Sequence, residues 1–281
     1  MAADLGDTYS IGELCLAHNV SRQAYYQHLQ AEAIVRYEEE IILQWVLEVR
    51  RRQPRIGGRK LLFMIEPKLE KAGFKLGRDG FFDLLRKNNM LIKRRKKYHY
   101  TTNSNHPFKR YQNLIADLKV VRRDQVFVAD ITYIDTNDGF LYLALLTDAA
   151  SRKIVGFDDS DSLAVEGSLR ALNASLADVT DTSSLIHHSD RGVQYCCYAY
   201  TGLLQSKKVR ISMAEKGNPY ENAMAERVNG ILKLEFLLDQ IYPSKAVARE
   251  AVHEAIHIYN YERPHGAINM LTPVQMYEQF C

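Results

Sequence analysis

Three acidic residues stand out because each lies where a predicted element would carry it toward a shared crevice. Asp130 interrupts the apolar stretch VFVADITYIDT, Asp190 ends LIHHSD, and Glu226 lies within ENAMAERVNGILKLEF. An ionised carboxylate in an apolar strand is costly unless it is paired or binds a metal ion. Carboxylate oxygens are ligands that Mg²⁺ prefers, so together the three acids predict a divalent-cation site. Taken singly, Asp190 could be a turn residue and Glu226 a residue of an exposed helix surface.

The elements that must position these acids are predicted by hydrophobic periodicity in residues 113–281. Apolar stretches predict five strands, at VFVADITYI, FLYLALLTDA, SRKIVGFDDS, SSLIHHSD and VRISMA. The first two are joined by a turn at Asn137-Asp138-Gly139. Helices are expected over 163–178, 198–206, 220–238 and 244–261. A three-strand meander followed by alternating helices and strands indicates a layered α/β domain, in which ligand crevices form at strand ends.

The first 35 residues fit a helix-turn-helix. Ile11, Leu14 and Leu16 give the first helix an apolar face, and Ser21 is a good N-cap for a second helix, SRQAYYQHL. In such a motif the start of the second helix can reach base edges in the major groove. The candidate DNA contacts are Arg22, Gln23 and Tyr25. A three-helix bundle with no DNA role would look the same.

Residues 36–91 predict a second helical DNA-binding unit. One helix is expected over 38–52, another after PRIGGRK with a kink or early end at Pro67, and a third in LGRDGFFDLLRKNNML, where Arg78 is a candidate DNA contact. Residues 92–112 then form a basic linker, with domain-boundary character near 105–112. Its five consecutive cations suit a DNA backbone, although a solvated linker is the alternative: Lys93, Arg94, Arg95, Lys96 and Lys97.

The net charge of +3 conceals an uneven distribution. Residues 1–112 carry 21 Lys and Arg against 12 Asp and Glu, a net of +9, whereas residues 113–281 carry 16 against 22, a net of −6. A basic first half favours a polyanionic partner. We find no signal peptide and no apolar run long enough for a membrane span. The four cysteines form no CxxC pair, which is typical of reduced thiols in a cytosolic protein.

Several motifs occur in order: VFVADITYIDT, GFLYLALLTDAASRKIVGF, IHHSDRGVQY, MAEKGNPYENAMAERVNGILKLEF and IHIYNYERPHGAINMLTPVQMY. Together they resemble the DDE transposases of the retroviral-integrase superfamily, and most closely the OrfB proteins of the IS-three family of insertion sequences. The resemblance covers residues 8–279. It includes the 35-residue spacing between Asp190 and Glu226 and the YN-x-x-RPH ending.

The resemblance implies an RNase H-like α/β catalytic domain, a mixed five-stranded sheet with flanking helices, preceded by all-α helix-turn-helix DNA-binding units. It also implies that Asp130, Asp190 and Glu226 are catalytic and bind two Mg²⁺ ions, with Mn²⁺ as a substitute. Such ions, about 3.5–4 Å apart, would assist the attacking and leaving oxygens of 3′-end cleavage and strand transfer. Further site residues implied are the phosphate contacts Arg227 and Lys233 and the supporting residues His188 and Asn222. His188 could equally be a packed histidine.

The resemblance further implies binding to double-stranded DNA, both terminal inverted repeats and target DNA, by a homo-oligomer in the bacterial cytoplasm at the nucleoid. An upstream OrfA-type protein, or a fusion to one, is expected as a partner, and no membrane is involved. Lys233 lies seven residues, about two helical turns, after Glu226, so the two residues share one face of the helix. The family carries a basic residue at the Lys233 position, which supports Glu226 over Glu221 and Glu235 as the third acid. A structural zinc is not expected, since Cys15, His18 and His28 do not supply the integrase His/Cys pattern.

The chain departs from the family pattern at two positions. Phe127 stands where Trp is usual, and Glu221 where Asp commonly precedes Asn-Ala. Neither change is expected to remove metal binding. Two other functions remain open at this point: a domesticated, non-catalytic DNA-binding protein, and an RNase H-like nuclease. The first would tolerate loss of the three acids, and the second would not need two preceding DNA-binding units.

Overall fold

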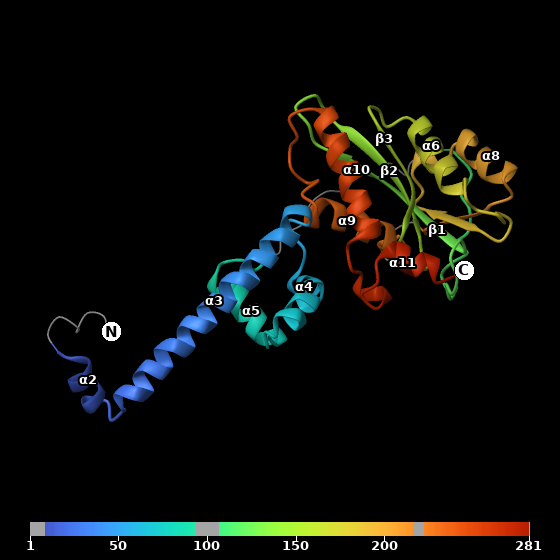
Figure 1. Ribbon diagram of the computed structural model, residues 1–281. Coiled ribbons are helices and arrows are strands. Elements are labelled where there is room, and N and C mark those ends of the chain that lie inside the picture. The colour runs from blue at the N-terminus through green and yellow to red at the C-terminus, as the bar shows by residue number, and fades with distance from the viewer. Residues whose placement is uncertain (1–8, 94–106, 216–221, 281) are drawn as a thin grey trace. The chain divides into compact units, whose positions relative to one another are not determined.

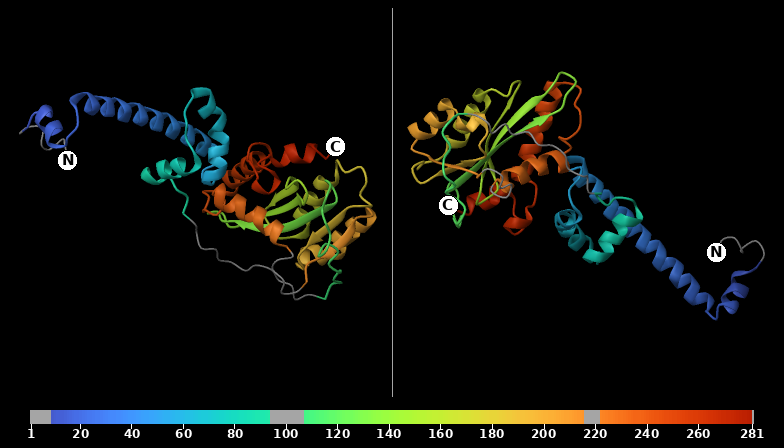
Figure 2. Two further views of the ribbon diagram at one scale, coloured as in Figure 1. Left: turned by 90° about the horizontal axis from the view of Figure 1, so that it is seen from below. Right: turned by 180° about the vertical axis from the view of Figure 1, so that it is seen from behind.

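The computed structural model describes residues 9–93, 107–215 and 222–280, and the chain divides into two compact units. The first contains the residues up to Arg51 together with Leu61–Leu91. The second contains Arg52–Lys60 and the residues from Ile92 onward. Figure 1 and the two views of Figure 2 show that the first is helical and the second is built around a sheet.

Among the described residues, the first unit contains four helices: α2 (Ile11–Ala17), α3 (Arg22–Arg52), α4 (Gly58–Ala72) and α5 (Arg78–Lys87). Ser10 and Glu13 form a capping box at the start of α2, and Ser21 accepts a hydrogen bond from the backbone N–H of Ala24 at the start of α3. Asn19, with φ 54°, makes the turn between the two helices. The buried side chains of this unit come mainly from the second half of α3 and from α4 and α5: Ile42, Val46, Leu61, Ile65, Leu69, Phe81, Leu84 and Leu85.

The helix α3 differs from the sequence-based prediction. Two helices were expected, one ending near Leu29 and one beginning near residue 38, whereas α3 runs unbroken for 31 residues. The reason is local, because residues 30–37 contain neither Gly nor Pro and include two alanines, which favour helix. The helix therefore crosses the expected boundary at 35–36. Similarly, Pro67 lies inside α4 without ending it.

The second unit contains the predicted mixed five-stranded sheet, with strand order β3-β2-β1-β4-β5. Its strands are β1 (Val126–Ile134), β2 (Leu141–Asp148), β3 (Ile154–Ser160), β4 (Ile186–Ser189) and β5 (Arg210–Met213). The meander pairs β1, β2 and β3 antiparallel, whereas β4 and β5 are added parallel to β1. This places β1, the strand that carries Asp130, in the centre of the sheet.

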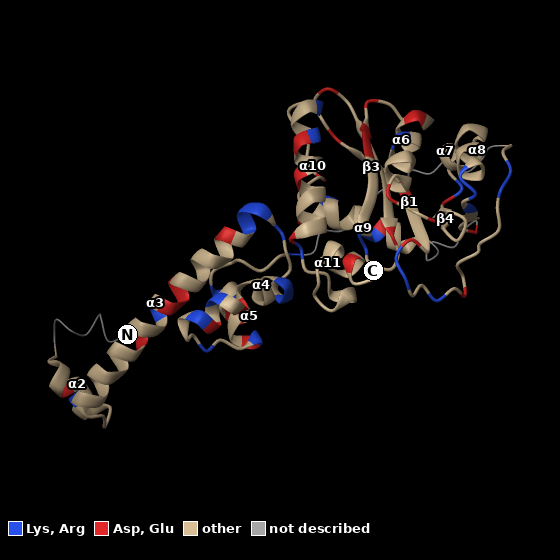
Figure 3. Ribbon diagram, turned by 45° about the vertical axis from the view of Figure 1, so that its right-hand side comes forward, with Lys and Arg blue, Asp and Glu red and all other residues tan. Residues whose placement is uncertain are grey.

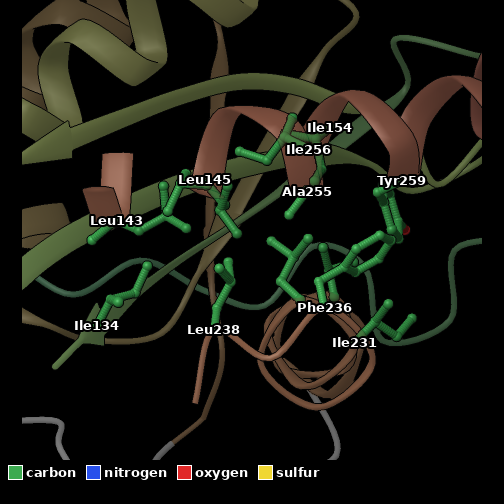
Figure 4. Packing of buried hydrophobic residues seen from close by; sticks show 14 of the residues in the cluster. Ile134, Leu143, Leu145, Ile154, Ile231, Phe236, Leu238, Ala255, Ile256 and Tyr259 are labelled. Carbon is green, nitrogen blue, oxygen red and sulfur yellow. The ribbon is translucent and has the colours of Figure 1, made fainter. Parts of the chain in front are cut away.

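Helices cover both faces of this sheet, so the unit has three layers. One face carries α6 (Val165–Leu176), α7 (Val193–Cys196) and α8 (Tyr198–Ser206), and the other carries α9 (Ala223–Glu235) and α10 (Lys245–Tyr261). The 3-10 helix η1 (Gly266–Ile268) and α11 (Pro273–Glu278) follow. Figure 4 shows Leu143 and Leu145 of β2 packed toward Phe236 and Ile256 of the second helical layer. Ala144 and Leu146 face the first layer, as strand alternation requires.

Residues 52–60 belong to the second unit although they join α3 to α4. Ile56 is fully buried, and the exposed fraction of Gln53 is only 2%.

Within the ranges described, no helix is both long enough and apolar enough to cross a membrane.

Candidate active site

Asp130 and Asp190 are brought together by the pairing of β1 with β4. The two strands are parallel, and Val128 lies opposite His188. Each acid follows its paired residue by two positions, which is one full strand repeat, so the register places the acids beside each other on the same face. Asp190 comes directly after β4, where the chain leaves the sheet.

Glu226 reaches the same region through α9. Nδ2 of Asn229 donates a hydrogen bond of 2.7 Å to Oδ2 of Asp130, and this bond ties α9 to β1. Lys233, one turn further along, places its Nζ 4.3 Å from the ring centre of Tyr133, also on β1. Glu226 lies three residues, about one turn, before Asn229. The two side chains therefore share the face of α9 that is turned toward β1. Its side chain is exposed.

The electrostatics of Asp130 show that the three acids influence one another. Burial raises the pKa of Asp130 to about 7, the neighbouring carboxylate of Asp190 adds to that effect, and Glu226 contributes further. Two hydrogen bonds oppose the shift, from Asn229 and from the backbone N–H of Ile131 at 2.9 Å. The region thus concentrates negative charge at the centre of the sheet.

A divalent cation fits this arrangement chemically. The donors are hard carboxylate oxygens, and the pKa of Asp130 is raised first by burial and then by the charge of Asp190; a cation would offset both effects by stabilising the ionised form. As the side chains stand, no group of three or more His, Cys, Asp or Glu residues in the described parts of the chain is arranged to hold a metal ion. The fit therefore rests on the donor chemistry and the mutual electrostatics of the three acids.

Two predicted supporting residues are buried. The exposed fraction of His188 is 0%, and its Nδ1 lies 2.8 Å from Oγ of Ser212 on β5. Of the two interpretations of His188, this burial favours the packed histidine over a side chain that touches a phosphate. Asn222 is buried at the N-cap position of α9, one turn before Glu226.

The sequence analysis missed Asn229 and the role of Glu235. Asn229 contacts Asp130 directly, and its spacing of three residues from Glu226 was the available signal. Glu235 is not free to bind metal, because it pairs with Arg263 and Lys60. Burial alone would raise the pKa of Glu235, but hydrogen bonds and charge from Arg263, with Lys60 adding to them, hold it below its usual value. Glu221 lies outside the described residues.

The predicted DNA contacts fall into three groups. Arg22 and Gln23 are exposed at the start of α3, whereas Tyr25 is half-buried with its ring edge-on to Tyr26. Arg78 is exposed and donates to Asp79, and Lys93 is exposed. Arg227 is exposed beside Glu226. The remaining predicted contacts lie outside the described residues: Arg94, Arg95, Lys96 and Lys97.

Charge is distributed differently over the elements of the two units. Figure 3 shows cations on α4, on α5 and at the end of α3, where Arg50, Arg51 and Arg52 are consecutive. Acidic residues are prominent on α10 and β3. This agrees with the charge asymmetry of the sequence.

Comparison with known proteins gives the same picture of the second unit. The family described as "Integrase core domain" matches residues 121–219, and a second family with that description matches residues 207–273. These two matches contain β1, β4 and α9, and hence all three acids.

Curated relatives match over most of the chain. A 31 kDa protein of insertion element IS600 from Shigella sonnei is 32% identical over 95% of this chain and 98% of its own length. The transposase for insertion sequence element IS904 from Lactococcus lactis is 33% identical over 62% of this chain and 73% of its own. Transposase InsF for insertion sequence IS3A from Escherichia coli is 27% identical over 95% of this chain and 93% of its own.

Solved structures with a similar arrangement are more distant. The HTLV-2 integrase catalytic core domain in complex with magnesium has a TM-score of 0.44 and 15% identity, covering 57% of this chain and 99% of that one. A chain of the simian T-cell lymphotropic virus intasome in complex with PP2A regulatory subunit B56 gamma has a TM-score of 0.48 and 14% identity, covering 83% of this chain and 74% of that one.

Proposed function

This chain belongs to the integrase-core family of insertion-sequence transposases, and from that premise we propose that Asp130, Asp190 and Glu226 form its catalytic metal site. The chain is a DNA transposase of the DDE class, with an RNase H-like catalytic unit. The observations that support this proposal are the electrostatic influence of Asp190 and Glu226 on Asp130 and the hydrogen bond that Asn229 of α9 donates to Asp130 on β1.

The chemistry divides between the cation and the side chains. Bound Mg²⁺, or Mn²⁺ in its place, would polarise the phosphate as a Lewis acid and lower the pKa of the attacking water or 3′-hydroxyl. Asp130 and Asp190 would hold the cations from the side of the sheet, and Glu226 would hold them from α9. Arg227 and Lys233 contact DNA phosphates as sequence-independent anchors. The oxygen of water attacks at the element end and frees a 3′-hydroxyl, which then attacks a phosphodiester of target DNA and displaces another 3′-oxygen.

The helical first unit binds the terminal inverted repeats of the element. Arg22 and Gln23 read base edges, with Tyr25 beside them, and Arg78 belongs to a second reading unit. The basic residues from Lys93 to Lys97 follow the phosphate backbone.

Two ends must be joined in one event, so the protein works as a homo-oligomer on DNA, with an upstream OrfA-type protein or fusion as a further partner. The reaction takes place in the bacterial cytoplasm at the nucleoid.

The test replaces each acid singly: Asp130→Asn, Asp190→Asn and Glu226→Gln. Each variant is expected to lose cleavage and strand transfer on a duplex that carries the element's terminal sequence, while its affinity for that duplex stays within about twofold. These substitutions keep the side-chain size and remove the charge needed for the cation. If a variant keeps near-wild-type strand transfer, the residue that it replaces does not belong to the metal site.

Two matched controls accompany these variants. Glu254→Gln, which removes an exposed carboxylate from α10, is expected to leave strand transfer unchanged. The same outcome is expected for Glu221→Ala, which removes the alternative third acid. If Glu221→Ala instead abolished strand transfer while Glu226→Gln did not, the third acid would be Glu221.

A further inference from the structure

The carboxylate of Glu235, the last residue of α9, receives four hydrogen bonds from two distant parts of the chain. Arg263 donates through Nε at 2.8 Å and through Nη2 at 2.9 Å, one bond to each oxygen. Lys60 donates the other two, with its Nζ 3.1 Å from Oε1 and 3.5 Å from Oε2. The exposed fraction of the Arg263 side chain is 1%, so its pairing with Glu235 is shielded from solvent. Bidentate pairing of this kind fixes orientation as well as distance.

The segment that precedes Lys60 also bonds to this helix end. The backbone N–H of Arg55 donates to the carbonyl oxygen of Glu235 at 3.0 Å. A helix leaves its last carbonyl groups without partners of its own, so this bond completes the end of α9. The segment Arg52–Lys60 belongs to the second unit, and Ile56 within it is fully buried.

Arg263 is itself fixed to the sheet through α10. The backbone N–H of Arg263 donates to the carbonyl of Ile258. Asn260 accepts from the N–H of Ile154 at 2.9 Å and donates to the carbonyl of the same residue at 3.0 Å. The hydroxyl of Tyr259 donates to the carbonyl of Arg152 at 3.0 Å. The YN-x-x-RPH motif therefore connects the start of β3 to the end of α9.

The helix α9 is consequently held at two points, six residues apart. Asn229 bonds to Asp130 on the face that carries Glu226, and Glu235 bonds to Arg263 and Lys60 at the helix end. Apolar side chains of α9, among them Val228, Ile231 and Leu232, also pack in the core of the second unit. The two polar contacts add directional bonds to this packing and so favour one rotation and one axial position of the helix.

We propose that Glu235, Arg263 and Lys60 are positioning residues of the transposase, which set α9 so that Glu226 faces Asp130 and Asp190. None of the three touches the acids, and their effect passes through the helix. This inference rests on the proposed metal site and extends it to three residues that do not contact the acids.

The test measures Mn²⁺ binding to the full chain by electron paramagnetic resonance, together with hydrogen exchange of α9 amides. Glu235→Gln keeps the size of the side chain and removes its charge. It is expected to weaken Mn²⁺ binding by about tenfold, an effect of the size that residues without contact to a ligand can have on its binding. Exchange of α9 amides should become faster, while affinity for nonspecific duplex DNA at low salt should stay unchanged. Lys60→Met, which removes a partner whose side chain is 18% exposed, is expected to act in the same direction more weakly.

The matched control is Arg170→Gln. Arg170 makes a bidentate pair with Asp158 in the same unit, between α6 and β3, away from α9. Its loss is expected to leave Mn²⁺ binding unchanged. If Glu235→Gln and Lys60→Met bound Mn²⁺ as tightly as wild type, the positioning role would be overturned, whatever their melting temperatures. Asp130→Asn tests the site itself: if it bound Mn²⁺ normally, the metal-site assignment would fail, not the positioning argument alone.

Discussion

Asn229 of α9 and Asp130 of β1 are joined by a hydrogen bond of 2.7 Å across 99 positions of the chain. The donor is an amide group and the acceptor is a carboxylate whose pKa is raised to about 7, chiefly by burial and by Asp190. A bond from a neutral donor stabilises the ionised form of an acid. Asn229 therefore keeps Asp130 more acidic than its surroundings alone would.

Replacing Asn229 with Ala should raise the pKa of Asp130 further. Since a proton competes with the cation for the carboxylate, the pH midpoint of Mn²⁺ binding is expected to move upward by about one unit. The midpoint is measured by titrating Mn²⁺ binding between pH 5.5 and 8.5. Asn173→Ala is the control, because Asn173 is exposed and bonds only within its own helix. An unchanged midpoint in Asn229→Ala would show that the bond does not tune Asp130.

The stability of the metal-free protein should depend on Asp130 with a definite sign. The folded-state pKa lies above the ordinary value of 3.8, so the folded chain binds this proton more tightly and stability falls as pH rises from about 4 to about 7. Asp130→Asn cannot ionise. It is expected to raise the melting temperature in EDTA at pH 8 by a few degrees, and less at pH 4.5.

The same variant separates metal binding from folding. Mg²⁺ should raise the melting temperature of wild type at pH 8, because it binds only the folded chain, and should leave that of Asp130→Asn almost unchanged. Calorimetry at the two pH values, with and without Mg²⁺, measures both effects. If Mg²⁺ raised the melting temperatures of wild type and Asp130→Asn equally, the cation would bind at a site that does not include Asp130.

Loss of a base contact and loss of a phosphate contact should weaken DNA binding in different ways. Arg22→Ala or Gln23→Ala is expected to cost about 1–3 kcal/mol on the element's terminal DNA and little on random DNA, since a base contact is lost. The double variant Arg94→Ala, Arg95→Ala should weaken binding to both duplexes about equally. It should also make the slope of log affinity against log salt concentration shallower by roughly 1–2 units. Competition binding across a salt series measures both.

Arg36→Ala provides the control for the base-reading variants, because Arg36 is an exposed cation further along α3. It should change neither specificity nor affinity by more than a small factor. If the Arg22 and linker variants lost specificity equally, the second helical unit around Arg78 would become the reader.

Two glycines of the second unit should respond to Ala in opposite ways. A Cβ at Gly156 of β3 would lie 2.3 Å from the carbonyl oxygen of Ala171, so β3 would be forced away from α6. The expected loss is about 2 kcal/mol of unfolding free energy. A Cβ at Gly202 of α8 meets nothing within 4 Å, and Ala there should stabilise by about 0.5–1 kcal/mol. Urea denaturation of both variants measures the difference, and equal effects would contradict the close packing of β3 on α6.

The sheet was predictable from sequence because its strands are short apolar runs separated by clear turns. Asp130 and Asp190 were predictable as polar residues at the middle and end of such runs. The unbroken α3 was missed because the break was assumed from a motif and not required by any residue between Leu29 and Glu38. Local patterns carry no information on contacts across the chain.

The contacts around Glu235 show this limit most clearly. Its carboxylate is bonded by Lys60, 175 positions earlier, and by Arg263, 28 positions later. Each of these residues, taken alone in the sequence, is an ordinary charged residue of a solvated helix or turn. Only the fold identifies them as one cluster, and only the fold shows that 52–60 belongs with the catalytic unit.

The central place of β1 in the sheet has a consequence for synthesis of the protein. The chain completes β1, β2 and β3 by Ser160, but the parallel partner β4 begins only at Ile186. At about 5–20 residues per second, the ribosome needs roughly one to five seconds to make the intervening residues. During that interval the meander presents the open edge of β1, the edge next to Asp130, and an unpaired edge can recruit another strand. Since α9 is made later still, the nascent meander carries Asp130 without Glu226, so the proposed metal site would be complete only after α9 has folded onto the sheet.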